Sequence, residues 1–278
     1  MIWWYVAGGI AAAILLIGLV FLFLIKPRSK SERPDTAPFV GVEYAHRGVH
    51  TATIPENSLR AFQGAVDRGL GIELDIQLSA DDQVMVVHDL DLKRVAGLDK
   101  KVRDLTADEL SRVSLCGQPD GIPTLRQVLS VVDGKVPLII ELKIPGMDLS
   151  VCEKAFEILD EYQGPYCIES FHPLAIARVR KLRPHVLRGQ LSSDFFKSKD
   201  APNNAVQLFA VKNLLLNVLA RPDFIAFDIR YPKALAFRLC CKLLGALPIG
   251  WTIRTKDELE AAKETFDAWI CENIYETE

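Results

Sequence analysis

Apolar and polar side chains alternate strictly along residues 71–78. Residues two apart on a β-strand share a face, so this pattern predicts a strand with one apolar and one polar face. The apolar face would carry Ile72, Leu74, Ile76 and Leu78, and the polar face Glu73, Asp75 and Gln77. The polar face of a single strand is often simply solvated, so this pattern alone does not indicate a functional site.

A second apolar run, residues 138–143, contains an acid and a base two positions apart, Glu141 and Lys143. Such a run is typical of a parallel strand covered by helices, where an embedded charge needs a partner. Neighbouring carboxylates repel each other unless a cation lies between them, and Mg²⁺ and Ca²⁺ prefer oxygen ligands. Glu73, Asp75 and Glu141 are therefore the predicted metal ligands.

Similar apolar runs recur along the chain and alternate with amphipathic segments. The predicted strands are residues 42–46, 71–78, 136–143, 166–171, 187–191, 224–228, 247–253 and 267–271, with a short extra strand at 84–87. Predicted helices include residues 57–68 and 205–220 and segments that start at Pro123, Ser150, Pro232 and Thr255. Ser150 is predicted to cap its helix, and Thr106 and Glu109 are predicted to form a capping box that starts a small helix. This alternation predicts an α/β fold, a TIM-type (β/α)8 barrel. Residues 90–122 are too long for an ordinary barrel loop and are predicted to form a small insertion.

Residues 2–25 contain no charged side chain, and this length exceeds the ~20 residues that a helix needs to cross a bilayer. Aromatic residues lie at one end, and four basic residues follow the other: Lys26, Arg28, Lys30 and Arg33. A cleaved signal peptide is the competing interpretation, but it would have a basic start and a shorter apolar core. The pattern predicts a retained single-pass anchor in the cell membrane, with the rest of the chain in the cytoplasm.

Residues 26–38 are polar and include three prolines, which predicts a linker that tethers a catalytic domain at 39–278. Charged residues make up 25% of the chain and the net charge is −3, which gives no sign of nucleic-acid binding. The six cysteines have no zinc-type spacing. The sequence does not predict an oligomeric state.

Five short motifs occur in order between the first and third predicted strands. They are His46-Arg47-Gly48, Pro55-Glu56-Asn57, Glu73-x-Asp75, His88-Asp89 and Glu141-x-Lys143. This ordered set resembles the glycerophosphodiester phosphodiesterases, and the resemblance extends from about Tyr44 to the C-terminus. It implies a TIM-type barrel with one divalent metal ion, Mg²⁺ or Ca²⁺, at its mouth. The implied reaction is hydrolysis of a glycerophosphodiester to sn-glycerol 3-phosphate and an alcohol.

Two other functions are weighed against this one. A lysophospholipase D would release lysophosphatidic acid from a lysophospholipid, and a membrane anchor favours it by holding the mouth near lipid. A non-catalytic barrel would act as a membrane-tethered binding or scaffold protein, and it would be expected to lack metal or histidine positions. All of these positions are filled in this sequence.

The remaining polar residues of the motifs suggest the other roles. His46 and His88 each end a predicted strand and form the expected acid–base pair, with the two roles unassigned. Arg47 is expected to bind phosphate, and its alternative is a surface ion pair. Lys143 either supplies a further positive charge for substrate binding or only neutralises Glu141.

Trp251 matches a motif of the family and is expected to line the substrate pocket, although it could equally pack in the core. Glu43 and Glu56 are weaker metal candidates. The chain departs from the family pattern in three places, Ser58, Arg254 and Cys271-Glu272-Asn273, and the last two affect substrate choice.

Overall fold

The computed structural model describes residues 2–197 and 205–275. Within them, eight parallel strands form a closed barrel, because β1 pairs with both β2 and β9. These strands are β1 (Glu43–His46), β2 (Gly71–Leu78), β4 (Leu138–Leu142), β5 (Tyr166–Ser170), β6 (Leu187–Ser192), β7 (Phe224–Asp228), β8 (Leu247–Ile253) and β9 (Ala268–Cys271). The short β3 (Val84–Val86) pairs antiparallel with the end of β2. The predicted TIM-type barrel is confirmed, and every predicted strand boundary lies within two residues of the observed one.

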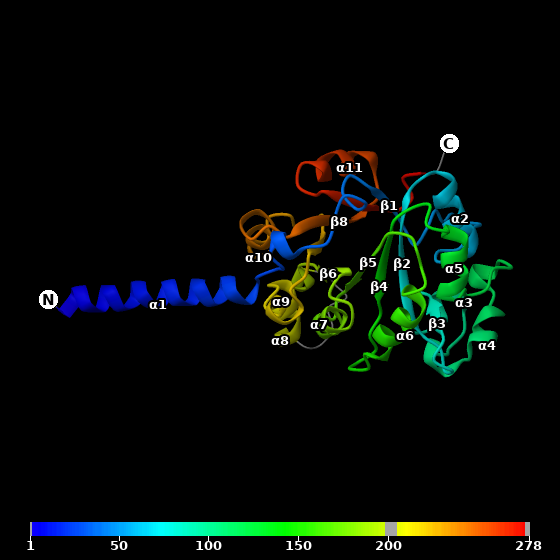
Figure 1. The fold of residues 1–278 in the computed structure, drawn as a ribbon, viewed down its shortest axis with the longest axis horizontal. Helices are drawn as coiled ribbons and strands as arrows, with labels where there is room; N and C mark the ends of the chain where they lie inside the picture. The colour runs from blue at the N-terminus through cyan, green and yellow to red at the C-terminus, as the bar shows by residue number, and fades with distance from the viewer. Residues whose placement is uncertain (1, 198–204, 276–278) are drawn as a thin grey trace.

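Helices cover the outside of the barrel (Figure 1). They are α2 (Leu59–Asp67), α5 (Leu125–Val132), α6 (Ser150–Leu159), α7 (Pro173–Leu182), α8 (Ala205–Lys212), α9 (Asn217–Ala220), α10 (Leu235–Arg238) with the π-helix η5 (Leu239–Leu243), and α11 (Lys256–Lys263). The insertion after β3 contains α3 (Lys93–Ala96) and α4 (Ala107–Ser111), and the predicted capping box of Thr106 and Glu109 starts α4. Short 3₁₀ turns are η1 (Lys30–Glu32), η2 (Val102–Asp104), η3 (Leu115–Gly117) and η4 (Phe195–Lys197).

Two helix predictions were wrong in detail. The segment 205–220 is not one helix but two, α8 and α9, because Leu214 between them has a φ of 56°, outside the helical region. Ser150 does not cap α6: it is the first helical residue, Leu149 precedes the helix, and the Ser150 hydroxyl has no hydrogen-bond partner among the described residues.

Inward-facing side chains fill the barrel in layers of different polarity. The lower layers are apolar and form one buried cluster that includes Tyr44, Ile139, Cys167, Phe224 and Ile249. Nearer the carboxyl ends of the strands, the register sets Asp75 beside Glu141 and Glu141 beside Glu169. The outer face of β2 packs instead against the helices through Ile72, Leu74 and Ile76. The barrel thus buries a row of acids above an apolar plug, at the end where sites form in this architecture.

The N-terminal helix α1 (Ile2–Leu24) extends away from the barrel as an isolated rod (Figure 1). It is 23 residues long with a mean hydropathy of 2.7, and its apolar side chains are not buried in the protein. The helix is long and apolar enough to cross a membrane, and a signal sequence would have the same character.

Residues 26–38 pack along the amino-terminal ends of the strands. This segment therefore contacts the barrel more closely than expected of the predicted linker. The Arg28 backbone N–H donates to the Pro222 carbonyl at 2.9 Å, and the Arg28 side chain pairs with Asp223 at 3.1 Å. Arg33 donates to the Gly245 carbonyl at 2.6 Å. These contacts fix the exit of α1 at the barrel end opposite the acidic layer.

Candidate active site

The three predicted metal ligands lie together. Glu73, Asp75 and Glu141 each offer a carboxylate oxygen within 4.8 Å of the others, and all three side chains are buried. Strand parity explains the cluster, because Glu73 and Asp75 are two apart on β2 and Asp75 lies beside Glu141 on β4. The structure therefore contains an acidic triad that could hold a metal ion.

A tight turn after β1 brings Arg47 and Asn57 onto Asp75. The Arg47 Nε atom lies 3.3 Å from Asp75 Oδ2, and the Asn57 side chain donates to the same oxygen at 2.9 Å. The turn needs Gly48, whose φ is 80° and where a Cβ would lie 2.7 Å from the Ala61 backbone. The backbone N–H of Arg47 also donates to Glu73 Oε2 at 3.2 Å.

Lys143 bridges two of the acids: its ammonium nitrogen lies 2.9 Å from Asp75 and 2.8 Å from Glu141. Burial tends to raise the pKa of Asp75, but Lys143, His88 and Arg47 outweigh it and lower that pKa. Burial raises the pKa of Glu141 to about 7 despite Lys143. The sequence left open whether Lys143 supplies charge or neutralises Glu141, and its contacts favour neutralisation.

Burial and neighbouring carboxylates also raise the pKa of Glu73 and of Glu169 well above their usual range. Glu169, on β5, is 1% exposed, and its Oε2 atom has no partner among the described residues. Four buried carboxylates thus share two cations, Arg47 and Lys143. The raised pKa values of three of them reflect this shortage of positive charge, and a set of oxygen donors short of positive charge suits a divalent hard cation.

The two predicted catalytic histidines flank the triad. His46 Nε2 lies 3.9 Å from Glu73 Oε2, and His46 Nδ1 lies 3.4 Å from Glu272 Oε2. His88 Nδ1 lies 2.6 Å from Asp89 Oδ1. Burial lowers the pKa of both histidines, so both are mainly neutral at pH 7.

An outer ion-pair network holds the turn and the His88 loop together. Glu56 pairs with Arg47 at 2.8 Å and with Arg94 at 2.7 Å, and Arg94 also pairs with Asp89 at 2.6 Å. Glu56 therefore holds the turn after β1 against the His88 loop through its ion pairs. Glu43 lies at the opposite end of β1 and accepts a hydrogen bond from Tyr275 at 3.4 Å.

A cavity of about 180 Å³ opens beside these groups. Its lining includes His46, Arg47, Glu73, His88, Glu141, Glu169, Phe171, Trp251 and Arg254. Trp251 lines this cavity and packs edge-on against Phe171, with 5.6 Å between ring centroids, and both rings also pack against the apolar cluster inside the barrel. The sequence-predicted residues thus lie together in and around one cavity, with Asp75 and Lys143 in contact with its lining residues.

Sequence reasoning missed Glu169, Arg94 and the role of Glu272. Glu169 ends an apolar strand as Glu141 does, so a signal of the same kind was present. Arg94 lies in the insertion, where no periodic pattern points to the site. Glu272 and Arg254 follow the adjacent strands β9 and β8 and form an ion pair at 2.7 Å at the rim of the mouth, which only the folded barrel brings together.

Comparison with known proteins agrees with this geometry. The model of the glycerophosphoryl diester phosphodiesterase family matches residues 46–230. A glycerophosphodiester phosphodiesterase of Caldanaerobacter subterraneus subsp. tengcongensis is 33% identical over 78% of this chain and 87% of its own length. A lysophospholipase D of Mus musculus is 31% identical over 51% of this chain, which corresponds to 48% of the mouse protein.

Solved structures share the fold. A phosphodiesterase of Oleispira antarctica in complex with the product sn-glycerol-3-phosphate has a TM-score of 0.68, with 21% identity over 84% of this chain and 93% of that chain. A glycerophosphodiester phosphodiesterase of Thermotoga maritima has a TM-score of 0.64, with 24% identity over 83% and 93% of the two chains. Since the family match covers both histidines, the acidic triad and most of the barrel, this chain is a phosphodiesterase that belongs to the glycerophosphoryl diester phosphodiesterase family.

Proposed function

We propose that this protein hydrolyses glycerophosphodiesters to sn-glycerol 3-phosphate and an alcohol, with a divalent metal ion bound by Glu73, Asp75 and Glu141. The observation that carries the proposal is the cluster of buried carboxylates with excess negative charge beside His46, Arg47 and His88. A phosphodiester anion has to be neutralised and its leaving group protonated, and this cavity offers groups for both tasks.

The metal ion would supply positive charge to the phosphate oxygens and lower the pKa of a bound hydroxyl. Its ligands would all be carboxylate oxygens, a set that suits Mg²⁺ or Ca²⁺. Because Lys143 contacts two of these carboxylates, we expect it to adjust the net charge of the ligand set and not to contact substrate directly.

The histidines would transfer protons. The Asp89 carboxylate accepts from His88, so the proton of neutral His88 lies on Nδ1 and the basic atom is Nε2. The Nδ1 atom of His46 faces Glu272, which orients that ring in the same way. Arg47 lines the cavity and would bind a phosphate oxygen.

The membrane anchor is part of the proposal. α1 would cross the cell membrane once, and the barrel would face the cytoplasm, since the basic residues that follow the helix resist translocation. Lysophospholipase D activity is the second candidate, supported by the likeness to the Mus musculus enzyme and by the proposed anchor. A scaffold role is disfavoured because both histidines and all three acids of the triad are present.

A product assay with purified full-length protein tests the proposal. Glycerophosphocholine, glycerophosphoglycerol and a lysophospholipid would be supplied separately, with Mg²⁺ or Ca²⁺. Release of sn-glycerol 3-phosphate from either of the first two substrates is the expected result. Release of lysophosphatidic acid alone would assign lysophospholipase D activity instead, and no turnover by the folded protein would favour the scaffold role.

A further inference from the structure

A cavity of about 430 Å³ lies at the amino-terminal ends of the strands, opposite the active site. Five of its lining side chains are basic, Lys26, Arg28, Arg180, Arg188 and Arg221, and Glu32 is the one acidic side chain that lines it. They come from the segment after α1, from α7, from β6 and from the turn after α9. Residues far apart in the sequence thus converge on one basic cavity.

Arg188 occupies an unusual position. It lies on β6, between barrel and helices, and is 2% exposed. Its Nε atom donates to the Ala220 carbonyl at 3.0 Å, whereas its Nη1 atom is buried without a hydrogen-bond partner among the described residues. No carboxylate of the described residues lies within ion-pair distance of it. A buried guanidinium is costly unless an anion pairs with it.

Arg28 also has a buried guanidinium group whose hydrogen-bond donors are only partly satisfied. Its Nε atom pairs with Asp223 at 3.1 Å, but its Nη2 atom is buried and has no partner among the described residues. Burial lowers the pKa of Arg28 and of Arg221, and the charge of Arg180 lowers both further. Within the part of the chain that the structure describes, Glu32 is the one acid that lines the cavity and Asp223 pairs with Arg28 beside it, so an added anion would relieve the repulsion.

The cavity adjoins the end of α1. The Arg221 guanidinium lies over the ring of Phe23 in α1, 5.7 Å from its centroid, and donates to the Lys26 carbonyl at 3.2 Å. The Ile25 carbonyl accepts from the Asn217 side chain at 3.2 Å. A bilayer crossed by α1 would therefore have its headgroups at the level of the basic cavity.

Helices near the end of α1 also expose apolar side chains. Large hydrophobic side chains are exposed on α8, α9, α10 and η5: Val206 80%, Phe209 55%, Leu219 45%, Leu235 65% and Leu243 62%. Figure 1 shows α8, α9 and α10 at the side of the barrel where α1 leaves it. Exposed apolar side chains on these helices, together with the basic cavity, suit a surface that rests on anionic lipid.

We propose that the basic cavity binds the phosphate group of an anionic phospholipid in the leaflet next to the barrel. The proposal that the bound phosphate belongs to a lipid rests on the proposed membrane anchor, whereas the proposal that the cavity binds a phosphate group does not. One arginine guanidinium group can bind two phosphate oxygens at once. Arg28 and Arg188 each have one buried guanidinium nitrogen that has no hydrogen-bond partner among the described residues and could bind such an oxygen. The bound lipid would hold the amino-terminal end of the barrel against the bilayer, with the active site at the far end of the strands, open to water-soluble substrates.

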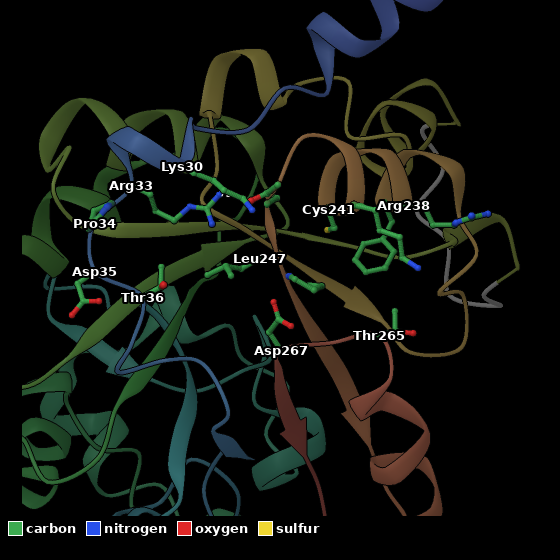
Figure 2. Close-up of a pocket in the computed structure, with 15 residues that line it drawn as sticks. Lys30, Arg33, Pro34, Asp35, Thr36, Arg238, Cys241, Leu247, Thr265 and Asp267 are labelled. Atoms are coloured by element: carbon green, nitrogen blue, oxygen red, sulfur yellow. Dashed lines mark hydrogen bonds between the residues drawn. The ribbon is translucent and has the colours of Figure 1, made fainter.

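A neighbouring cavity provides a matched control. Figure 2 shows it, with Lys30, Arg33 and Arg238 among its lining residues. Two acids, Asp35 and Asp267, also line that cavity. Arg238 is exposed and lies outside the basic cavity, so Arg238→Gln removes one charge from the same end of the barrel without changing the proposed site.

The test measures thermal unfolding of the full-length protein in a neutral detergent. The added probes are dihexanoyl phosphatidylglycerol, dihexanoyl phosphatidylcholine and inorganic phosphate. Phosphatidylglycerol at about 100 times its Kd should raise the Tm by about 5–10 °C, more than either other probe. Arg180→Gln and Arg221→Gln should each weaken its Kd about tenfold, and Arg238→Gln should not.

Four results would overturn the proposal: no rise in wild-type Tm with phosphatidylglycerol, an equal rise with phosphatidylcholine, an equal rise with inorganic phosphate, or undiminished binding in both arginine variants. Arg188→Met provides a second variant whose folding is checked by its Tm without ligand. Hydrolysis of glycerophosphocholine in detergent should be unchanged in Arg180→Gln and Arg221→Gln. Failure of lipid binding is thereby distinguished from failure of the proposed enzymatic function.

Discussion

Arg254 and Glu272, which follow the adjacent strands β8 and β9, form an ion pair at 2.7 Å at the rim of the barrel mouth. Both stand at positions where the chain departs from the pattern of the family it resembles, so the two departures are in contact. The same oxygen of Glu272 lies 3.4 Å from His46 Nδ1. The pair thus links the rim of the mouth to a predicted catalytic residue.

We expect the two members of this pair to contribute unequally to catalysis. The Arg254 side chain is 60% exposed, and exposed ion pairs contribute about 0–1 kcal/mol, so Arg254→Gln should lower kcat/KM by at most about fivefold. Glu272→Gln should cost about tenfold or more, because it removes the carboxylate that faces His46. Steady-state kinetics of both variants and of the double variant measure this difference. A loss in Arg254→Gln as large as in Glu272→Gln would contradict it.

Glu272 should also make stability depend on pH. The nearby His46 side chain lowers the pKa of Glu272 from 4.5 to about 2, against the opposing effect of burial and with a smaller contribution from Arg254. Because the folded pKa lies below the unfolded one, this stabilisation is complete above about pH 4.5 and is lost as pH falls toward 2. The difference in free energy of unfolding between wild type and Glu272→Gln should shrink from pH 7 to pH 3. Urea unfolding in EDTA at pH 7, 4 and 3 measures it, and a constant difference would refute the assignment.

The histidines should matter for rate and not for metal binding. His46→Ala and His88→Ala should each lower kcat by about 10²–10⁴-fold, the usual contribution of a general acid or base. Calorimetric titration with Mg²⁺ or Ca²⁺ should give a nearly unchanged affinity. His50, 3.8 Å from Glu272 and not among the residues that line the cavity, provides the matched control. A loss below about threefold in His88→Ala would end its proposed role in proton transfer.

The proposed anchor predicts an orientation. A C-terminal reporter that is active only in the cytoplasm should give signal, and one that is active only outside should not, because basic residues follow α1. The mature chain should retain α1 in mass spectrometry. Signal from the outside reporter alone, or a mature chain that begins after residue 20, would exclude the cytoplasmic anchor.

The sequence predicted most of the barrel because its strands carry strong local patterns. Gly71–Leu78 alternates so clearly that its bounds were predicted exactly as observed, and Glu73 and Asp75 followed from strand parity. The break at Leu214 was missed because residues 214–216 are all leucine, with no glycine or proline to mark a turn. The contacts of Arg28 with Asp223, and of Arg254 with Glu272, join residues far apart in the chain. No local pattern encodes such pairs, so the basic cavity and the rim of the mouth emerged only from the fold.

The metal dependence of hydrolysis tests the role of the acidic cluster. Full-length protein would be assayed for release of sn-glycerol 3-phosphate from glycerophosphocholine, first in EDTA and then after addition of Mg²⁺ or Ca²⁺. Wild-type protein and Glu43→Gln, whose side chain lies at the other end of β1, should be inactive in EDTA and recover with metal. Glu141→Gln should remain folded and at least about 10²-fold slower with metal. Full turnover in EDTA, or a normal metal-dependent rate in Glu141→Gln, would contradict a metal-dependent phosphodiesterase built on Glu73, Asp75 and Glu141.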